Sequence, residues 1–415
     1  MNPHTSMTDS PALPRPGAAR KRAVGDLALL GGDHAFDPPV STSNLSRPDP
    51  ERLLGYARRF HDARRYTADG PLGALLEARL REFHECEHVV SFSCGFWALA
   101  LAIRCLALPG RTEVVMPSLT YRRMADAVAW TGLIPRFCEV DARTLGMTRE
   151  TAAVALTPQT ALILGAQPIV NCCDMSGLEA LAAETGLPLL IDSVESTYES
   201  YEGRRIGNFG RAELFSMHAS KLLNGMEGGY VTTNDSELDA RLRRLRAVGA
   251  DAGGDIAELG INARLSEIHA AFALANLDAL GDCIAHNEAI YRTYQRTLCD
   301  LPGLRLLAFD ESERCGFKNI VVELEEAWPL TRELTIAHLN AEGVLARAYY
   351  HPPLHARTTA YEQRGLELPV SDALGERFLL LPCGANTTAD DVCDVVALLH
   401  FLSDNAPALR DAARP

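Results

Sequence analysis

Lysine is the scarcest charged residue in this chain of 415 residues. Only three lysines stand among 40 basic residues, and the other 37 are arginine. Arginine therefore fills nearly every position where a positive charge alone is enough, and a lysine that is kept is a candidate for chemistry that needs an amine. Arginine cannot lose its proton in a protein, whereas lysine can, and its neutral amine attacks carbonyl groups to form a Schiff base. The three lysines are Lys21, Lys221 and Lys318.

The sequence also lacks a long apolar run, a basic cluster and a metal-binding cysteine pattern. No stretch of about 20 apolar residues is present, and the start has no apolar core of the kind a secretory signal requires. A net charge of −14 argues against nucleic acid as a main partner, although a small anionic ligand remains possible. The 11 scattered cysteines are typical of reduced thiols, and the adjacent Cys172 and Cys173 make a poor zinc pair. We therefore expect a cytoplasmic protein without a metal site.

The composition indicates a globular protein with a large core. A hydrophobic content of 47% and a charged content of 23% suit either two domains or one large and one small lobe. Residues 1–25, rich in proline and arginine, are expected to form a mobile tail to which we assign no function. We place the large domain, with an N-terminal segment, at residues 26–285 and the small C-terminal domain at residues 286–415.

Helical patterns alternate with short apolar runs between about residues 75 and 235, which predicts an α/β fold with a mostly parallel sheet. We expect strands at 88–92, 113–116, 134–140, 161–165, 189–192 and 213–216. Connecting helices are expected at 75–83, 98–106, 125–131 and 175–185. One long amphipathic helix is expected at 265–298, before a smaller α/β lobe with a strand at 320–323 and helices at 334–341 and 392–401.

Polar residues gather just past the ends of these predicted strands. Open α/β sheets bind ligands at the carboxyl ends of their strands, so one pocket could collect these side chains. The residues concerned are Ser93 to Gly95, Pro117 to Tyr121, Asp192, and Ser216 to Lys221.

An aldehyde cofactor with an aromatic ring needs an amine, an acid opposite the ring nitrogen, and a flat group against the ring. Lys221 is the candidate amine, Asp192 the candidate acid, and Tyr121 the candidate stacking residue. Each has a simpler interpretation on its own: a surface lysine beside a glycine-rich turn, a turn or cap aspartate, and a packing aromatic. Their convergence favours a site.

A phosphate on the same cofactor needs hydrogen-bond donors. The backbone amides of Gly95 and Phe96, at the start of the helix predicted after the first strand, could receive it at a helix N-terminus. The Ser216 hydroxyl could lie opposite. Alternatively, Gly95 simply opens a helix and Ser216 is an ordinary hydroxyl at the end of a strand.

The segment from Phe215 to Gly229 resembles the lysine segment of the DegT-type sugar aminotransferases. These are pyridoxal-phosphate-dependent enzymes of fold type I, which implies a large domain around a mostly parallel sheet and a smaller C-terminal α/β lobe. The resemblance runs from about Leu27 to Leu402. Further matching segments, in the order of the family, are Leu29 to Gly32, Tyr66 to Leu72, Val115 to Tyr121, Ile206 to Gly210, and Asn262 to Ile268.

The resemblance implies a role for each matching residue. Lys221 would hold the cofactor aldehyde and move a proton, Asp192 would pair with the pyridine nitrogen, Ser216 would bind the phosphate, and Tyr121 would lie against the ring. Asn262 matches a residue that reaches the phosphate of the neighbouring subunit, which implies a homodimer with a shared active site.

Two further matches lie nearer the edge of the expected site. Glu195 stands where the family has a polar residue close to the cofactor. His355 matches a histidine of the small lobe near the sugar, although it could equally be a surface loop histidine.

The chain departs from the family beside the expected phosphate site. The family usually has Asn-Gly-Thr where this chain has Cys94, Gly95 and Phe96, so one hydroxyl is missing and a bulky ring replaces it. Arg122 and Arg123 follow Tyr121 where smaller residues are common, and the neighbouring Trp97 and Met124 are also large. We expect weaker or rearranged phosphate binding and an unusual substrate side of the pocket.

The resemblance implies amination of a nucleotide-linked 4-keto-6-deoxyhexose with L-glutamate as donor, in the biosynthesis of deoxyaminosugars such as those of antibiotics. Two alternatives stay open. The cofactor could serve a keto cyclitol or another reaction at a sugar carbon, although Lys221 argues against a related dehydratase branch that has histidine there. A non-catalytic ligand-binding or regulatory protein of the same fold is the other alternative.

Overall fold

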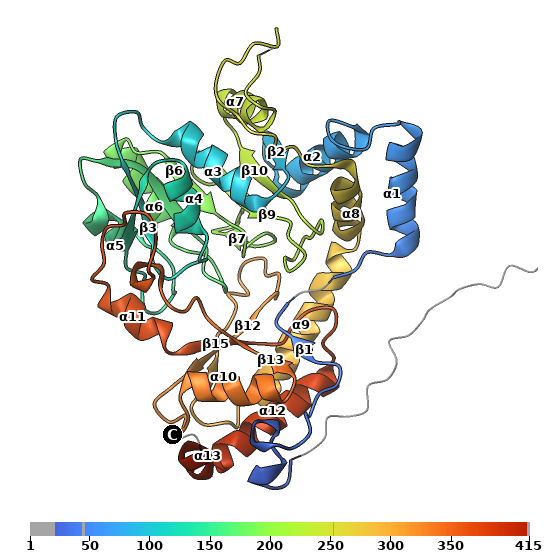
Figure 1. Ribbon diagram of the computed structural model, residues 1–415, viewed down its shortest axis with the longest axis vertical. Helices are drawn as coiled ribbons and strands as arrows, with labels where there is room; N and C mark the ends of the chain where they lie inside the picture. Colours follow the sequence, from blue (N-terminus) through green and yellow to red (C-terminus); the bar gives the residue numbers. More distant parts are fainter. Residues whose placement is uncertain (1–20, 44–45, 252, 413–415) are drawn as a thin grey trace, which may run out of the picture.

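The computed structural model describes residues 21–43, 46–251 and 253–412, which form a large and a small lobe (Figure 1). The predicted tail falls mostly on residues 1–20, outside the described residues. Residues 21–43 lie with the small lobe: β1 (Val40–Ser41) pairs with β13 (Val344–Leu345), and Lys21 pairs with Glu342 at 2.8 Å. This segment, grouped with the large domain in the predicted division, therefore contacts the other lobe. Two short 3-10 helices, η1 (Val24–Asp26) and η2 (Ala28–Leu30), precede β1.

A seven-stranded sheet in the order β2-β10-β9-β6-β5-β3-β4 forms the centre of the large lobe. Only β10 runs antiparallel to its neighbours, so the predicted mostly parallel sheet is confirmed. Its strands are almost wholly buried, as expected for a sheet covered on both faces. The strands are β2 (His88–Phe92), β3 (Glu113–Pro117), β4 (Ile134–Cys138), β5 (Thr160–Ala166), β6 (Leu189–Asp192), β9 (Ala212–Ser216) and β10 (Gly229–Thr233).

Helices cover both faces of this sheet and form two separate apolar cores. One core collects side chains from α2 (Pro71–His84), α6 (Met175–Thr185) and α8 (Glu267–Asp278). The other collects side chains from α3 (Gly95–Leu106), α4 (Met124–Trp130) and α7 (Ser236–Arg246). Two more helices, α1 (Pro50–Asp62) and α5 (Arg149–Ala155), and a short hairpin, β7 (Ser200–Tyr201) with β8 (Arg204–Arg205), complete this lobe.

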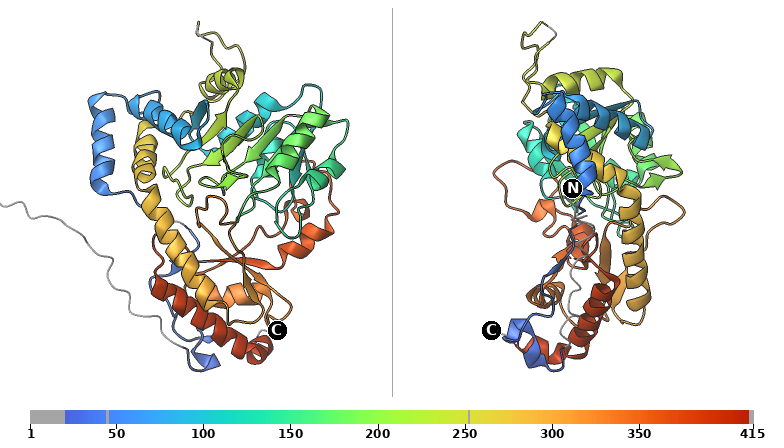
Figure 2. Two further views of the ribbon diagram at one scale, coloured as in Figure 1. Left: turned by 180° about the vertical axis from the view of Figure 1, so that it is seen from behind. Right: turned by 90° about the vertical axis from the view of Figure 1, so that its right-hand side faces the viewer.

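The small lobe has a four-stranded antiparallel sheet in the order β11-β12-β15-β14 and its own apolar core. Views from behind and from the side show it below the large lobe, with helices against the sheet (Figure 2). Its strands are β11 (Leu304–Leu306), β12 (Ile320–Leu324), β14 (Arg347–Ala348) and β15 (Phe378–Leu381). Its helices are α10 (Arg332–Ala341), η3 (Leu354–Ala356), α11 (Pro369–Gly375), α12 (Ala389–Asp404) and α13 (Ala406–Ala412).

The single long helix expected at 265–298 is wrong, because the structure has two helices there, α8 and α9 (Leu280–Thr297), at 60° to each other. Leu277 and Leu280 pack in a large-lobe core, whereas Ile290 and Tyr291 pack in the small-lobe core. The chain bends at Ala279 because the two halves bury their apolar faces in different lobes. Helix α9 carries the chain from one lobe to the other (Figure 1).

None of the helices among the described residues has, by itself, both the length and the apolar composition of a membrane span. Two bent pairs of helices have this length and composition when each pair is taken together.

Candidate active site

A cavity of about 1020 Å³ lies between the lobes at the carboxyl ends of the central strands. This volume is at the upper end of the range for small-molecule sites, so it can hold a cofactor together with a substrate. The large lobe contributes nearly all of the predicted site residues: Gly95, Phe96, Tyr121, Asp192, Glu195, Ser216 and Lys221. The small lobe contributes residues that the sequence did not indicate, among them Lys318, Asn319, Arg347, Tyr350 and His351.

Lys221 lies in the loop between β9 and β10, and its ammonium group pairs with Glu195. The distance from Lys221 Nζ to Glu195 Oε1 is 2.6 Å, and the lysine side chain is only 18% exposed. The other carboxylate oxygen, Oε2, accepts hydrogen bonds from Lys318 Nζ at 2.6 Å and from Asn319 Nδ2 at 3.2 Å. Glu195 is therefore a bridge between two lysines from different lobes.

The charge balance of this bridge fixes the ionisation of Glu195. Burial acts to raise the pKa of Glu195, but the ammonium groups of Lys221 and Lys318 outweigh it and hold the pKa well below its usual range. Burial, opposed by Glu195, lowers the pKa of Lys318. The site therefore holds an ionised carboxylate between two cations.

Asp192 ends β6 and faces the same cavity. Burial raises its pKa to about 6, while the Val194 amide and Lys221 act in the opposite direction. Among the described residues its side chain accepts one hydrogen bond, from the Val194 N–H to Oδ1 at 3.2 Å. The carboxyl group therefore has capacity left for a cationic or N–H partner inside the cavity.

The N-terminus of α3 forms the opposite end of the cavity. Its N-cap residue, Cys94, makes no side-chain capping bond, so the first amides of the helix, including those of Gly95 and Phe96, have no cap acceptor. A Cβ atom added to Gly95 would lie 3.1 Å from the Cβ of Ser216, so glycine keeps the space beside this hydroxyl open. Free amides and a hydroxyl at a helix N-terminus suit a phosphate group.

Tyr121 lies at the mouth of the cavity and is 49% exposed. The role of Tyr121 in stacking stays a prediction.

Two predicted residues lie outside the cavity of their own chain. Asn262 is exposed, beside Ala247 in an isolated backbone bridge. His355 is 7% exposed, and both ring nitrogens are occupied: Nδ1 lies 2.7 Å from Ser118 Oγ and Nε2 lies 3.1 Å from Asp372 Oδ1. His355 thus joins the small lobe to the end of β3, and a sugar contact by this residue stays a prediction.

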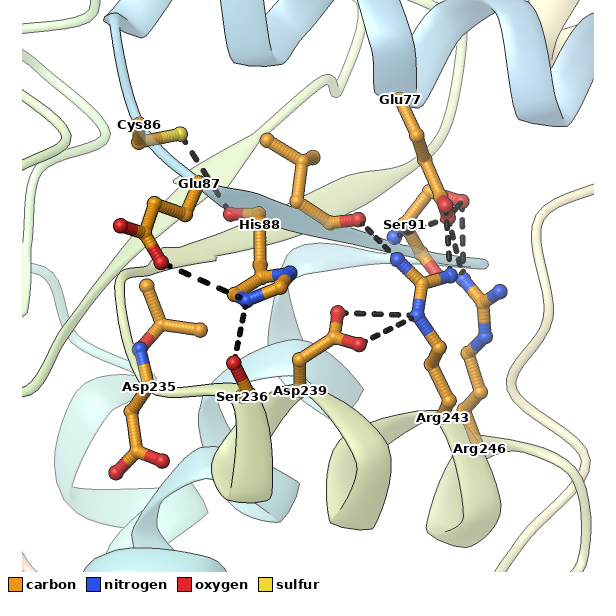
Figure 3. A network of polar contacts seen from close by, with 12 residues as sticks. Glu77, Cys86, Glu87, His88, Ser91, Asp235, Ser236, Asp239, Arg243 and Arg246 are labelled. Carbon is orange, nitrogen blue, oxygen red and sulfur yellow. Dashed lines mark hydrogen bonds and ion pairs between the residues drawn. The ribbon is translucent and has the colours of Figure 1, made fainter.

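A buried ionic network holds the backbone that leads into the phosphate end (Figure 3). Glu77 accepts hydrogen bonds from Arg243 at 2.7 Å, from Arg246 at 2.8 Å and from the Ser91 N–H at 3.0 Å. Burial acts to raise the pKa of Glu77, but Arg246 and Arg243 outweigh it, so the pKa is lowered. The carbonyl of Arg246 also accepts the Ala263 N–H at 2.9 Å, which fixes the segment that carries Asn262.

The small-lobe residues were missed because their strands are short and their polar residues follow no motif. Lys318 was the exception in principle, because the scarcity of lysine had already singled it out. The scarcity of lysine therefore marks Lys318 as well as Lys221.

One exposed group of possible metal ligands occurs among the described residues. Ligand atoms of Glu333, His351 and Glu376 lie within 4.8 Å of one another. The Arg332 guanidinium nitrogen lies 2.5 Å from a carboxylate oxygen of Glu333 and 3.3 Å from one of Glu376, so this arginine already pairs with both carboxylates.

These features together fit pyridoxal phosphate. The cavity has a shielded amine at Lys221, a buried carboxyl at Asp192 with a free acceptor, and an open helix N-terminus beside Ser216. The mostly parallel sheet, the smaller second lobe and this arrangement define a pyridoxal-phosphate-dependent transferase of fold type I.

The family follows from comparison with known proteins. Residues 49–400 match the DegT/DnrJ/EryC1/StrS aminotransferase family, and the chain belongs to it. It is a pyridoxal-phosphate-dependent sugar aminotransferase, which sets aside the non-catalytic alternative.

Individual relatives agree with this assignment. The chain is 29% identical over 331 residues to GDP-perosamine synthase of Caulobacter vibrioides, covering 78% of this chain and 88% of that protein. It is 30% identical over 335 residues to UDP-N-acetyl-3-dehydro-alpha-D-glucosamine 3-aminotransferase of Acidithiobacillus ferrooxidans, covering 80% and 88%. The crystal structure of DesI in the presence of its TDP-sugar product matches with a TM-score of 0.90 and 34% identity, covering 95% of this chain and all of that one.

Proposed function

We propose that this enzyme aminates a nucleotide-linked 4-keto-6-deoxyhexose and takes the amino group from L-glutamate. The observation that carries the proposal is the placement of Lys221 between Asp192 and Glu195 in one cavity that is large enough for a cofactor and a sugar. The product then serves the biosynthesis of a deoxyaminosugar.

The relatives support a nucleotide sugar as acceptor. DesI has a TDP-sugar product according to its structure, and the chain is 25% identical to dTDP-4-amino-4,6-dideoxy-D-glucose transaminase of Shigella dysenteriae, over 88% of this chain and 99% of that protein. The relative from Acidithiobacillus acts at carbon 3, so amination at carbon 3 is the competing outcome. We favour carbon 4 because of the likeness to the Shigella enzyme, whose name gives an amino group at carbon 4.

Bound pyridoxal phosphate supplies an aldehyde that condenses with amines and a ring that withdraws electrons from the adjacent carbon. Lys221 would supply the amine that holds the aldehyde and, when free, would carry the proton that the cofactor makes labile. Asp192 would hold the ring nitrogen in its protonated form, and Ser216 with the Gly95 and Phe96 amides would hold the phosphate. Tyr121 would lie against the ring.

The cavity mouth has positive charge to spare for a diphosphate. Arg123 is paired with Asp126 at 2.9 Å, whereas the guanidinium groups of Arg122 and Arg347 have no carboxylate partner within the described part of the chain. Guanidinium groups bind phosphate oxygens with two parallel hydrogen bonds. In a chain with a net charge of −14, this local excess of arginine supports a substrate with an anionic diphosphate portion.

The active unit in this proposal is a homodimer. Asn262 is not among the residues that line the cavity of its own chain, and it ends a segment with exposed apolar residues. Val248, Ile256 and Leu259 in that segment are 47%, 59% and 74% exposed, as expected for a surface that a partner covers. We place Asn262 at the phosphate of the neighbouring subunit.

The proposal is tested by product analysis. The purified enzyme is incubated with L-glutamate and a panel of nucleotide-linked sugars that carry the keto group at carbon 3 or carbon 4, and the products are identified by mass spectrometry. We expect amination of a 4-keto-6-deoxyhexose with release of 2-oxoglutarate. Amination of only the 3-keto sugars, or of a keto cyclitol instead, would contradict the choice of substrate.

Chemical trapping assigns the amine. Borohydride reduction of the loaded enzyme followed by peptide mapping should place the cofactor on Lys221, because the charge of this lysine acts to lower the pKa of Asp192. Lys318 is the internal comparison, since it is the other lysine in the cavity. Lys221→Ala should lose turnover and keep its fold, and a label on Lys318 would overturn the assignment.

A further inference from the structure

We propose that Lys318 is a positioning residue that acts on Lys221 through Glu195: by sharing the carboxylate, it weakens the hold of Glu195 on the Lys221 ammonium group and makes that amine easier to deprotonate. This inference deepens the proposed function, because it rests on Lys221 as the reactive amine. The scarcity of lysine and the geometry of the cavity support it independently.

The first argument is residue choice. Arginine occupies 37 of the 40 basic positions, yet the position beside Glu195 in the small lobe holds a lysine. A compact ammonium group fits beside one carboxylate oxygen, whereas a guanidinium group would reach for both oxygens. A lysine at this position therefore takes Oε2 and leaves Oε1 to Lys221.

The second argument is burial. The Lys318 side chain is 7% exposed, and its Nζ lies 2.6 Å from Glu195 Oε2. A buried ammonium group is costly unless it is paired, so this position is held by the interaction with Glu195. Asn319 donates a second hydrogen bond to the same oxygen at 3.2 Å, so Oε2 has two partners from the small lobe.

The third argument is the effect of charge on reactivity. An amine that forms a bond with an aldehyde must first lose its proton. If Glu195 served Lys221 alone, the carboxylate would stabilise the protonated amine and hinder this loss. A second cation on the same carboxylate weakens that hold, which favours the neutral amine of Lys221.

The connection also crosses the lobes. Lys318 lies two residues before β12 of the small lobe, whereas Glu195 and Lys221 belong to the large lobe. The Glu195 bridge therefore makes the protonation of the Lys221 amine depend on the position of the small lobe relative to the large lobe.

The test measures amine reactivity in the full-length, cofactor-free protein. The protein is treated with formaldehyde and cyanoborohydride between pH 6 and pH 10, and methylation of each lysine is followed by peptide mass spectrometry. In Lys318→Met the pH at which Lys221 is half reactive should rise by about one unit, so its rate below that pH falls about tenfold. In Lys318→Arg, which keeps the charge and can take both carboxylate oxygens, this pH should not rise above the wild-type value.

Lys21 is the matched control, because it is also a shielded lysine paired with a glutamate but lies outside the cavity. Its own reactivity should not change in Lys318→Met, and Lys21→Met should leave Lys221 unchanged. In a Glu195→Gln background most of the effect of Lys318→Met should disappear. Lys318→Gln, which keeps a polar group beside Glu195, replaces methionine if Lys318→Met does not fold.

The proposal is overturned if the pH at which Lys221 is half reactive stays the same or falls in a folded Lys318→Met or Lys318→Gln protein. It is also overturned if Lys318→Arg raises this pH as far as Lys318→Met does. Because this experiment needs neither cofactor nor sugar, its failure is distinct from failure of the proposed substrate.

Discussion

Glu213 is a buried carboxyl group in β9 that does not line the cavity. Its Oε1 accepts hydrogen bonds from the Gly207 N–H at 2.6 Å and the Phe209 N–H at 2.7 Å, and its Oε2 contacts the Ser193 hydroxyl. Burial outweighs these bonds and raises the pKa of Glu213 from 4.5 to about 7. The folded protein therefore binds a proton at this position that the unfolded chain releases near pH 4.5.

This shift predicts how stability depends on pH. Between pH 4.5 and pH 7 the folded state holds more protons than the unfolded state, so Glu213 makes the free energy of unfolding fall as the pH rises. Glu213→Gln, which resembles the protonated form, should flatten part of this slope and raise the melting temperature above pH 7. Melting curves from pH 5 to pH 8 measure the effect, with the exposed Glu326→Gln as control. Equal slopes in wild type and Glu213→Gln would refute this explanation.

At the scale of elements, the start of α3 is a part of the site where one added methyl group should weaken the binding of the cofactor. Gly95→Ala should weaken cofactor binding about tenfold, which corresponds to about 1.4 kcal/mol, because the new Cβ would lie 3.1 Å from Ser216. Alanine favours helix, so the substitution should not unfold α3. The measurement is an absorbance titration of the cofactor-free protein with pyridoxal phosphate.

The control for this change is Gly281→Ala, also in the first turn of a helix, where an added Cβ would meet no atom within 4 Å. It should bind the cofactor as the wild type does. Equal affinity of Gly95→Ala and Gly281→Ala would exclude the phosphate from the space beside Ser216.

The elements that the sequence predicted well are those whose burial is uniform. The strand at 189–192 and the helix at 175–185 occur with the predicted bounds, because an apolar run or a regular apolar face specified each of them. The bend at Ala279 could not be predicted, because the apolar pattern continues through it while the partner core changes. The helix Pro50–Asp62 was not predicted, although Asp49 caps it, because it has no buried residue.

The site residues also fall into those that the sequence could place and those that it could not. Residues at strand ends, such as Asp192 and Ser216, could be placed together because parallel strands end at one edge of a sheet. The contact between Glu195 and Lys318 joins residues 123 positions apart and depends on how the two lobes pack, which no local pattern records.

At the scale of the whole molecule, the proposed shared site can be tested by complementation. Lys221→Ala and Asn262→Ala chains with different tags are co-expressed, and the mixed dimer is purified. One of its two sites then has Lys221 from one chain and Asn262 from the other, so about half of the wild-type activity should return. If Asn262 acts within its own chain, the mixed dimer will be no more active than the Asn262→Ala dimer.

The scarcity of lysine has a practical consequence for handling the protein. All three lysine side chains are shielded and ion-paired: Lys21, Lys221 and Lys318 are 6%, 18% and 7% exposed. Dyes, crosslinkers and solid supports that react with amines find almost no surface lysine on the described residues. Attachment through carboxylates or exposed thiols such as Cys299 and Cys393 avoids the proposed catalytic amine, whereas forcing amine coupling at high pH directs the reagent into the cavity.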